Sequence, residues 1–550
     1  MAAEQELLIH GGSIHTVSHG DAEAILAHGE QIAAVGSLAE LRQMSSPTAA
    51  TFNLQGRTLV PAFVDAHNHY SHAALGRARA IQCWGAPIGD VTSVDDLLAR
   101  LRADPGSGWL RGFGLTDEQL GRLPTREELD AAAPERPVFL MHWSLHEAVV
   151  NTAALEIAGI GRETPDPPGG LIVRGPDGAP TGHLVEAAMA LAERHAWSDI
   201  DAEVLLEAAS ARLRLGIGAL GDTSTSPAAE RAYIEAAGRL PIEIGMLFIG
   251  RDGILAPPLD RLEGPGAGER APHVHATHIK LWLDGGRSEG PFSEGRHGAE
   301  AASSRRFAPY SDSDLADILA RARRAGLSVA MHAITSPGVE QALRAIEGAL
   351  RAHPESDDPL YRIEHATSLT EDQIRRMSSV GAWAVIQPQM LQLAGMALRA
   401  IADDPAAAWW FRYRDMADAG VRLAASSDYP CFVGLSQYES PLFGMQTAVT
   451  RATADGGTHR PDQALTAAES LRASTLGAAG ALGLDHRLGS VEPGKDASFA
   501  ILNADPLASS VDWNDLRVDR LMLRGVWRYE SGDAGGGHHP GPPAAAPPSG

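Results

Sequence analysis

A short apolar run that ends in two histidines constrains this chain more than any other stretch. Residues 60–66 are apolar except for Asp65, and they lead directly into His67, Asn68 and His69. The composition predicts a buried parallel strand, and side chains alternate between the faces of a strand, so the two imidazoles point the same way. Two imidazoles on one face, at the C-terminal end of a strand, suit a metal site at the mouth of a barrel. We therefore expect the active site at this position.

The composition is that of a soluble globular protein, with 44% hydrophobic and 21% charged residues among 550. At this length we expect two or three structural units, one of which can be a large barrel with insertions. The chain has 46 basic and 69 acidic residues and a net charge of -23, which argues against nucleic acid or an anionic membrane as a partner.

The cysteine count and the N-terminus indicate a cytoplasmic protein. Cys83 and Cys431 are too few for a disulfide framework or a structural zinc site built from cysteines. The first six residues are acidic and lack the basic and apolar segments of a signal peptide. No uncharged apolar stretch is long enough to span a bilayer.

The two ends of the chain both have the pattern of short strands separated by turns. Residues 6–59 contain several such strands, and residues 497–502 and 518–525 form a second block. We expect residues 1–59 and 481–530 to pair into one composite β-sandwich domain. Residues 531–550 are rich in Gly, Pro and Ala and show no periodicity, so we predict a disordered tail.

The middle of the chain, residues 60–480, alternates strands with helical stretches such as residues 311–325. This alternation predicts an α/β fold, a (β/α)8 TIM barrel. A long insertion, about residues 73–209, follows the first barrel strand and is expected at the catalytic face, where barrel loops grow. After the strand at residues 60–69, seven further strands are expected at residues 219–222, 242–249, 279–283, 327–332, 362–365, 382–386 and 421–425.

Residues with metal-binding or acid–base chemistry stand at or near the ends of these strands. They are His67, His69, Lys280, His332, His365 and Asp428. A lone histidine near a strand is more often a packed core or surface group, but so many on successive strands of one chain predict a metal-dependent active site. Lys280 lies near the start of its apolar run, and a buried ammonium is costly unless it is neutralised or modified.

Several further stretches carry a family resemblance that extends over nearly the whole chain. They are residues 60–69, 136–140 with His146, 151–155, 180–182 with 186–188, Lys280 with 284–285, 329–333, 362–365, 419–421 with 427–428, and 489–495. In these stretches the chain resembles the amidohydrolase superfamily, in the branch of the N-substituted formamide deformylase-like enzymes.

The resemblance implies a role for each strand-end residue. His67 and His69 would bind the more buried metal, and a carbamylated Lys280 would bridge two ions. His332 and His365 would hold the second metal, and Asp428 would act as general base and then as general acid. Zinc is the default among the metals that such ligands accept, as one or two ions. The resemblance also implies a homo-oligomer, a dimer.

The expected reaction is hydrolysis of a C–N bond in a small amide, an N-formyl or N-acyl compound or a cyclic amide, by a metal-activated water. Alternatives stay open: an esterase or carbamate hydrolase, a deaminase on the same scaffold, or a non-catalytic barrel protein. In the family, deaminases often use one metal and an additional His/Glu pair.

The residues that would contact substrate are harder to identify. Candidates on the insertion or on strand-end loops are Trp84, Arg111, Phe113, His142, His146 and Arg287. Residues 333–337, which follow His332, differ from the Ile-Gly-Asp-Arg of many relatives, so the substrate stays open. His273, His275 and His278 precede the expected Lys280 strand, and we assign them to surface or core packing.

Overall fold

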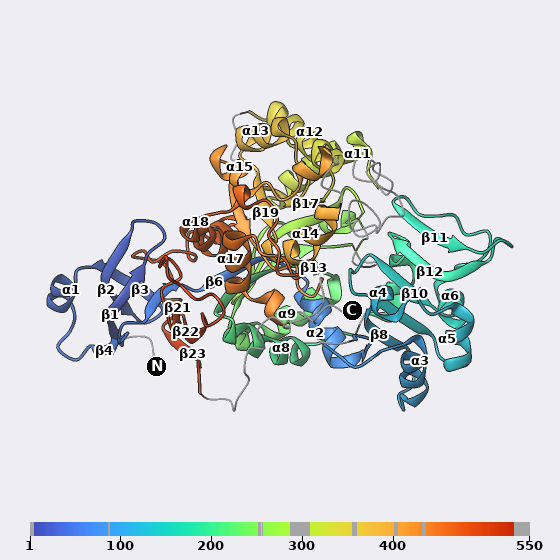
Figure 1. Ribbon diagram of the computed structural model, residues 1–550, viewed down its shortest axis with the longest axis horizontal. Helices are drawn as coiled ribbons and strands as arrows, with labels where there is room; N and C mark the ends of the chain where they lie inside the picture. Colours follow the sequence, from blue (N-terminus) through green and yellow to red (C-terminus); the bar gives the residue numbers. More distant parts are fainter. Residues whose placement is uncertain are drawn as a thin grey trace, which may run out of the picture.

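The computed structural model describes residues 5–85, 88–197, 199–250, 253, 255, 257–285, 309–354, 360–400, 405–431 and 436–532. Its strands form three sheets, which lie side by side along the long axis of the molecule (Figure 1). The predicted tail, apart from its first two residues, and Arg287 lie outside the described residues. Within the described part of the chain, no helix combines the length and the apolar character needed to cross a membrane.

Both ends of the chain share one sheet of eight strands, which confirms that they build a separate β-rich unit. The strand order is β23-β22-β21-β5-β1-β2-β3, and β4 pairs with β1 as well. Helix α1 (Leu38–Met44) packs on this sheet. The strands of the sheet are β1 (Glu6–His15), β2 (Asp21–His28), β3 (Gln31–Gly36), β4 (Ala50–Asn53), β5 (Thr58–Pro61), β21 (Phe499–Leu502), β22 (Val518–Leu523) and β23 (Val526–Glu530).

The apolar run before the two histidines is two strands and not one. Its first part, β5, pairs antiparallel with β21 as far as Pro61. The Ala62 amide still donates to the carbonyl of Ser498, whereas the Phe63 amide donates to Gly216 at 2.9 Å. Ala62 is therefore the point where the chain leaves the β-rich unit and enters the barrel. Both strands are buried throughout, so their apolar composition alone does not separate them.

Eight parallel strands form the nearly closed barrel, which confirms the predicted fold class. Their order is β20-β19-β18-β17-β16-β14-β13-β6, and β15 (Gly268–Ala271) adds antiparallel to β16. The barrel strands are β6 (Phe63–Asn68), β13 (Ile217–Thr225), β14 (Glu243–Phe248), β16 (Val274–Trp282), β17 (Ser328–Ala333), β18 (Tyr361–His365), β19 (Trp383–Ile386) and β20 (Arg422–Ala425). Every strand found by the sequence pattern is present.

Helices surround the barrel, apart from α19 (Ala478–Ala481), which packs against apolar strand residues inside it. Capping residues mark where several helices begin. Ser311 caps α11 and Thr370 caps α13 in full capping boxes, and Thr335 accepts a hydrogen bond from the Gly338 amide at the start of α12. The helices are α2 (Tyr70–Arg79), α8 (Ala202–Arg214), α9 (Pro227–Ala236), α11 (Asp312–Arg324), α12 (Ser336–Ala352), α13 (Glu371–Val380), α14 (Leu391–Ala400), α15 (Tyr413–Asp418), α16 (Ser436–Glu439), α17 (Pro441–Thr450), α18 (Ala467–Arg472) and α19 (Ala478–Ala481).

The segment between α2 and α8 builds the third sheet, of six strands in the order β11-β12-β10-β9-β8-β7 (Figure 1). Its apolar core continues onto Ile249, Trp282 and Cys431, which follow or end barrel strands. The insertion therefore packs on the C-terminal mouth of the barrel. Its elements are β7 (Ile81–Gln82), α3 (Val94–Ala103), β8 (Leu110–Leu115), α4 (Asp117–Leu120), α5 (Arg126–Ala132), β9 (Val138–His142), β10 (Glu147–Val150), α6 (Thr152–Ala158), β11 (Gly170–Arg174), β12 (Pro180–Glu186) and α7 (Ala190–Ala196).

The opposite end of the barrel is held by a buried carboxylate. Glu243 opens β14, is 1% exposed, and accepts hydrogen bonds from His273 at 2.8 Å, His275 at 2.7 Å and Arg524 at 2.6 Å.

The position of three histidines relative to β16 differs in part from the prediction. Because β16 begins at Val274, the expectation that His273, His275 and His278 all precede the strand is wrong for His275 and His278. Both side chains are buried, in line with their assignment to packing, and His275 contacts Glu243.

We expect Glu243→Gln to lower the free energy of unfolding at pH 7 by about 3 kcal/mol, because a buried cation such as Arg524 loses its partner. Burial would raise the pKa of Glu243, but His273 and His275 hold it well below its usual range. A depressed folded-state pKa stabilises the fold above the unfolded value, about 4.3, and this stabilisation is lost as the pH falls. Urea unfolding of both proteins at several pH values should show curves that converge on acidification.

The matched control is Glu530→Gln, since Glu530 pairs with Arg520 at the surface and its side chain is 45% exposed. This variant should change stability by less than about 1 kcal/mol. Equal losses in the two variants, independent of pH, would contradict the role given to Glu243.

Candidate metal centre

Barrel closure brings the two ends of the predicted site together. The Asp428 amide, beyond β20, donates to the His67 carbonyl at 2.8 Å, and the His69 amide donates to the Tyr429 carbonyl at 2.9 Å. Asp65 adds a side-chain contact, accepting from the Ser427 amide at 2.9 Å. These bonds join the first barrel strand to the segment after the last one, at the C-terminal end where barrel enzymes carry their active sites.

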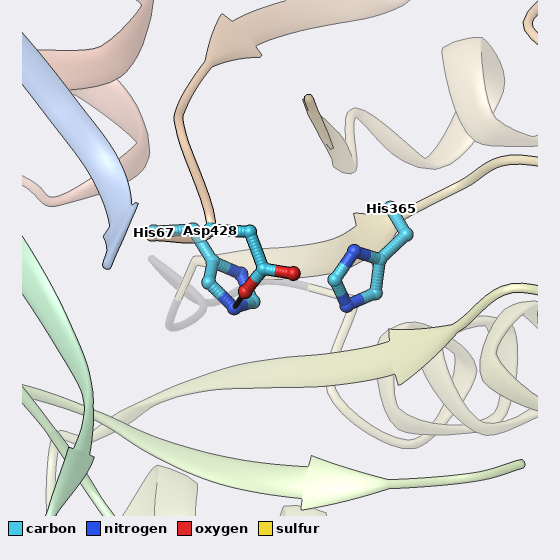
Figure 2. A group of neighbouring side chains, drawn as sticks. All are labelled: His67, His365 and Asp428. Atoms are coloured by element: carbon cyan, nitrogen blue, oxygen red, sulfur yellow. Dashed lines mark ion pairs between the residues drawn. The ribbon is translucent and has the colours of Figure 1, made fainter. Parts of the chain in front are cut away.

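The side chains of His67, His69 and Asp428 converge on one point. Asp428 Oδ1 lies 3.0 Å from His67 Nε2 and 3.1 Å from His69 Nε2, and all three residues are buried. Figure 2 shows the Asp428 carboxylate between the imidazoles of His67 and His365. Despite these short distances, Asp428 Oδ1 has no well-aligned hydrogen bond among the described residues. A buried carboxylate oxygen in this state is suited to a cation.

His332 and His365 form the second half of the cluster. They end β17 and β18, and their ring centroids are 4.4 Å apart, while the ring of His365 lies 5.0 Å from that of His67. His332 Nε2 is buried without a hydrogen bond to any described residue, and its nearest carboxylate oxygen, from Asp284, is 3.5 Å away. Four histidines and one aspartate thus gather at the ends of neighbouring strands.

The protonation states favour ligand chemistry. Burial lowers the pKa of His69 and of His365 to about 3, and it lowers the pKa of His332 well below its usual range. Burial would raise the pKa of Asp428, but the adjacent imidazoles of His67 and His69 hold it well below its usual range. Neutral imidazoles with free lone pairs and an ionised carboxylate are the forms that bind a metal.

Lys280 lies inside the barrel beside these ligands. It is 1% exposed, and its Nζ is 3.5 Å from His67 Nε2 and 4.8 Å from the centre of the Trp282 ring. Burial lowers its pKa to about 8, against the opposite influence of Glu364 and Asp428. Lys280 is the seventh residue of β16, so it lies near the C-terminal end of its strand and not near the start, as the apolar run had suggested.

Two ligand positions have left-handed backbone conformations. The φ angle is +70° at His365 and +55° at Asp428, and neither residue is a glycine. Such conformations are costly for L-residues and persist only where the surroundings hold them, often at functional sites. Here they turn both side chains toward His67.

The sequence did not assign the groups that orient the histidines. Glu364 Oε2 accepts from His67 Nδ1 at 2.5 Å, and Gln387 Oε1 lies 2.9 Å from His365 Nδ1. Arg362 pairs with Glu364 in turn, and both are fully buried. The sequence feature that could have identified Glu364 is the presence of two charged residues, Arg362 and Glu364, in the short buried strand that ends at His365. Partners of this kind fix the tautomer so that Nε2 faces the metal.

His146 joins the cluster from the insertion. Its ring centroid is 5.3 Å from that of His332, and its Nδ1 is 2.6 Å from Glu186 Oε2. Burial would lower the pKa of His146, but the Glu186 carboxylate raises it above the usual value. Glu186 belongs to one of the family-like stretches of the sequence, and only the structure pairs it with His146.

The other predicted pocket residues have partners inside the insertion. Trp84 and Phe113 pack against each other with ring centroids 6.3 Å apart, in the core of the insertion. Arg111 pairs with Asp199 at 2.9 Å. His142 is buried, with its Nδ1 2.8 Å from Ser144 Oγ. The structure therefore brings His146 to the cluster, and it holds these four residues in packing or ion-pair contacts.

The donor set fits a divalent cation. Imidazole nitrogens and a carboxylate oxygen are the ligands of zinc and related metals, and two of the donor atoms, Asp428 Oδ1 and His332 Nε2, are buried without a hydrogen bond among the described residues. A cation would satisfy both atoms. Without a bound cation, these two buried polar atoms would lack a partner, which is rare in folded proteins.

Comparison with known proteins identifies the family. The family model described as "Amidohydrolase family" matches residues 50–528. The chain belongs to the amidohydrolase family. The N-substituted formamide deformylase of Arthrobacter pascens is 32% identical, over 96% of this chain and 99% of that protein. The prediction of an amidohydrolase, a hydrolase acting on C–N bonds, is confirmed.

More distant similarities also extend over most of the chain. The protein LONG AFTER FAR-RED 3 of Arabidopsis thaliana is 26% identical over 94% of this chain and 89% of that protein. The crystal structure of an uncharacterized metal-dependent hydrolase from Pyrococcus furiosus superposes with a TM-score of 0.68 at 23% identity, covering 92% of this chain and all of that one. The structural similarity to the Pyrococcus furiosus protein confirms the fold.

We expect Glu364→Gln to weaken metal binding by about 10- to 100-fold, because His67 loses the charged acceptor that fixes its tautomer. Competition with a chromophoric chelator measures the dissociation constant. Glu439→Gln is the matched control, since Glu439 is a buried glutamate paired with Arg212 at 2.5 Å that has no contact with a ligand histidine among the described residues. A loss of affinity as large in the control as in Glu364→Gln would attribute the effect to general packing.

Proposed function

We propose that this amidohydrolase cleaves the amide C–N bond of a small N-formyl, N-acyl or cyclic amide compound in a metal-dependent reaction. The observation that carries the proposal is the convergence of His67, His69 and Asp428, with Asp428 Oδ1 buried and free of hydrogen bonds to described residues. The printed activity of the relative from Arthrobacter pascens, an N-substituted formamide deformylase, supports an N-formyl substrate.

We assign the metal ligands to two groups. His67, His69 and Asp428 would hold one ion, and His332 and His365 would hold a second, with zinc as the metal. Lys280, as a carbamate, would supply a carboxylate-like ligand to both. A divalent ion bound here would lower the pKa of a water molecule and polarise the scissile carbonyl.

Asp428 moves the proton in this scheme. Its depressed pKa keeps the carboxylate ionised, so it accepts a proton from the attacking water and then donates it to the leaving nitrogen. Oδ1 is directed at the two histidines, so we assign the transfer to Oδ2. Glu186 contacts Nδ1 of His146 and raises the pKa of this imidazole, and we assign Nε2 of His146 as a hydrogen-bond donor to the substrate.

The His146–Glu186 pair also favours a second candidate, a deaminase on the same scaffold, since family members of that kind use an additional His/Glu pair. A substrate panel separates the two functions. Release of an acid and an amine from N-formyl or N-acyl amines, or ring opening of lactams to amino acids, supports the amide hydrolase. Release of ammonia from amino-substituted heterocycles supports the deaminase. Faster turnover of esters or carbamates than of amides would instead favour an esterase or a carbamate hydrolase.

We expect Asp428→Asn to reduce amide hydrolysis by at least about 100-fold, because the amide cannot accept the proton of the attacking water. Initial rates on the best substrate of the panel, together with metal content, provide the measurement. Asp505→Asn is the control, since Asp505 contacts His15 in the β-rich unit, and its rate should match the parent. If Asp428→Asn hydrolyses the panel as fast as the parent, the proton-transfer role is wrong.

We expect the Lys280 amine to be carbamylated, because a pKa of about 8 leaves a substantial neutral fraction at neutral pH. The neutral amine adds carbon dioxide to give a carbamate and releases one proton. Protein incubated with zinc and ¹³C-bicarbonate should show a carbamate resonance by NMR that is absent from Lys280→Met. A parent protein with bound metal and no such resonance would rule the modification out.

We further propose a cytoplasmic homodimer acting on a small-molecule substrate. Both cysteines are free and buried, as expected for a reducing compartment. Light scattering coupled to size-exclusion chromatography measures the number of subunits.

A further inference from the structure

A thiol lies beside the candidate metal ligands and has no role in the scheme above. Cys431 follows Asp428 by three residues and is 5% exposed. Ligand atoms of His69, Asp428 and Cys431, one from each residue, all lie within 4.8 Å of one another. An imidazole nitrogen, a carboxylate oxygen and a thiol sulfur at this separation can share one small cation.

The surroundings hold the thiol in place and exclude water. Cys431 Sγ makes a weak contact with the Ser144 carbonyl at 3.6 Å, from the turn that precedes His146. Leu145 and Trp282 belong to the same buried apolar cluster as Cys431. The insertion therefore packs against Cys431 while the sulfur stays within reach of His69 and Asp428.

A second observation points to a cation at the same place. Asp428 is 4% exposed, and its Oδ1 has no hydrogen bond among the described residues. That oxygen is 3.1 Å from His69 Nε2, a contact whose geometry is not that of a hydrogen bond. An unpartnered buried acceptor beside an imidazole and a thiol is explained by a positive ion held between them.

We propose that Cys431 supplies a thiolate ligand to the cation bound by His69 and Asp428. This inference rests on the proposed metal-dependent function and adds a soft sulfur donor to its ligand set. Binding exchanges the thiol proton for the cation, and the proton leaves to solvent. A thiolate favours zinc over manganese and magnesium, so Cys431 acts as a metal-selecting residue.

The second cysteine of the chain provides the comparison. Cys83 is fully buried in the apolar core of the insertion, where its Sγ donates to the Ile81 carbonyl at 3.4 Å. Among the described residues, none of the potential metal-binding groups includes it. The two thiols are alike in burial and differ in their neighbours, so Cys83→Ser is the matched control for Cys431→Ser.

The test uses the full chain, stripped of metal and reloaded with Co²⁺ or Zn²⁺. We expect a near-ultraviolet thiolate-to-cobalt absorption band in the parent and in Cys83→Ser, and its loss in Cys431→Ser. X-ray absorption of the zinc form should show a sulfur neighbour at about 2.3 Å in the first two proteins only. Zinc affinity of Cys431→Ser should fall by at least about 10-fold, whereas manganese affinity should change less.

The outcomes separate this inference from the proposed function. A parent protein that binds cobalt and zinc with nitrogen and oxygen neighbours alone overturns the thiolate ligand and leaves the metal-dependent hydrolase intact. A parent protein that binds neither metal overturns both. If Cys431→Ser does not fold, the parent spectra decide the question by themselves, and Cys431→Ala provides a second variant without an oxygen donor.

Discussion

Closure of the barrel is the constraint on which the candidate site depends. The backbone hydrogen bonds of Asp428 and His69 hold the first barrel strand against the segment after the last one. Asp65 reinforces the same junction through Ser427. Because the backbone is fixed on both sides, the His67 imidazole and the Asp428 carboxylate meet at 3.0 Å although they lie near opposite ends of the barrel segment. Left-handed φ angles at Asp428 and His365 are maintained by this framework.

Two buried groups of charged residues in the barrel have different roles. Below the mouth, Arg362 donates to both carboxylate oxygens of Glu364 in a fully buried pair, and Glu364 Oε2 also accepts from His67 Nδ1. Such a pair contributes little net stability, because removing two charges from water costs several kcal/mol per ion. The Arg362–Glu364 pair instead fixes the position of the His67 imidazole. At the opposite end, the Glu243 cluster links the barrel to the β-rich unit through Arg524, and the apolar helix α19 packs inside between the two ends.

The insertion adds side chains and a turn to the candidate site that the barrel strands do not provide. Barrel strands contribute the metal-ligand candidates, whereas the third sheet contributes His146, its partner Glu186 and the turn that contacts Cys431. The solved structure of the uncharacterized metal-dependent hydrolase from Pyrococcus furiosus shares the fold of this chain. In the proposed function the metal chemistry resides in the barrel, and we expect the choice of substrate to reside where the insertion covers its mouth.

Local pattern was enough to predict the eight barrel strands, the β-rich unit of both chain ends and the convergence of His67, His69, His332 and His365. The barrel strands and the convergence of the histidines depend on side-chain alternation and on the rule that parallel strands end at one face, whereas the β-rich unit was predicted from short strands separated by turns. The orienting contacts of Glu364, Gln387 and Glu186, the depth of Lys280 in β16 and the approach of Cys431 to His69 emerged only from the tertiary structure. They depend on pairing and packing between segments far apart in the chain, and a sequence pattern records the neighbours along the chain but not the neighbours in space.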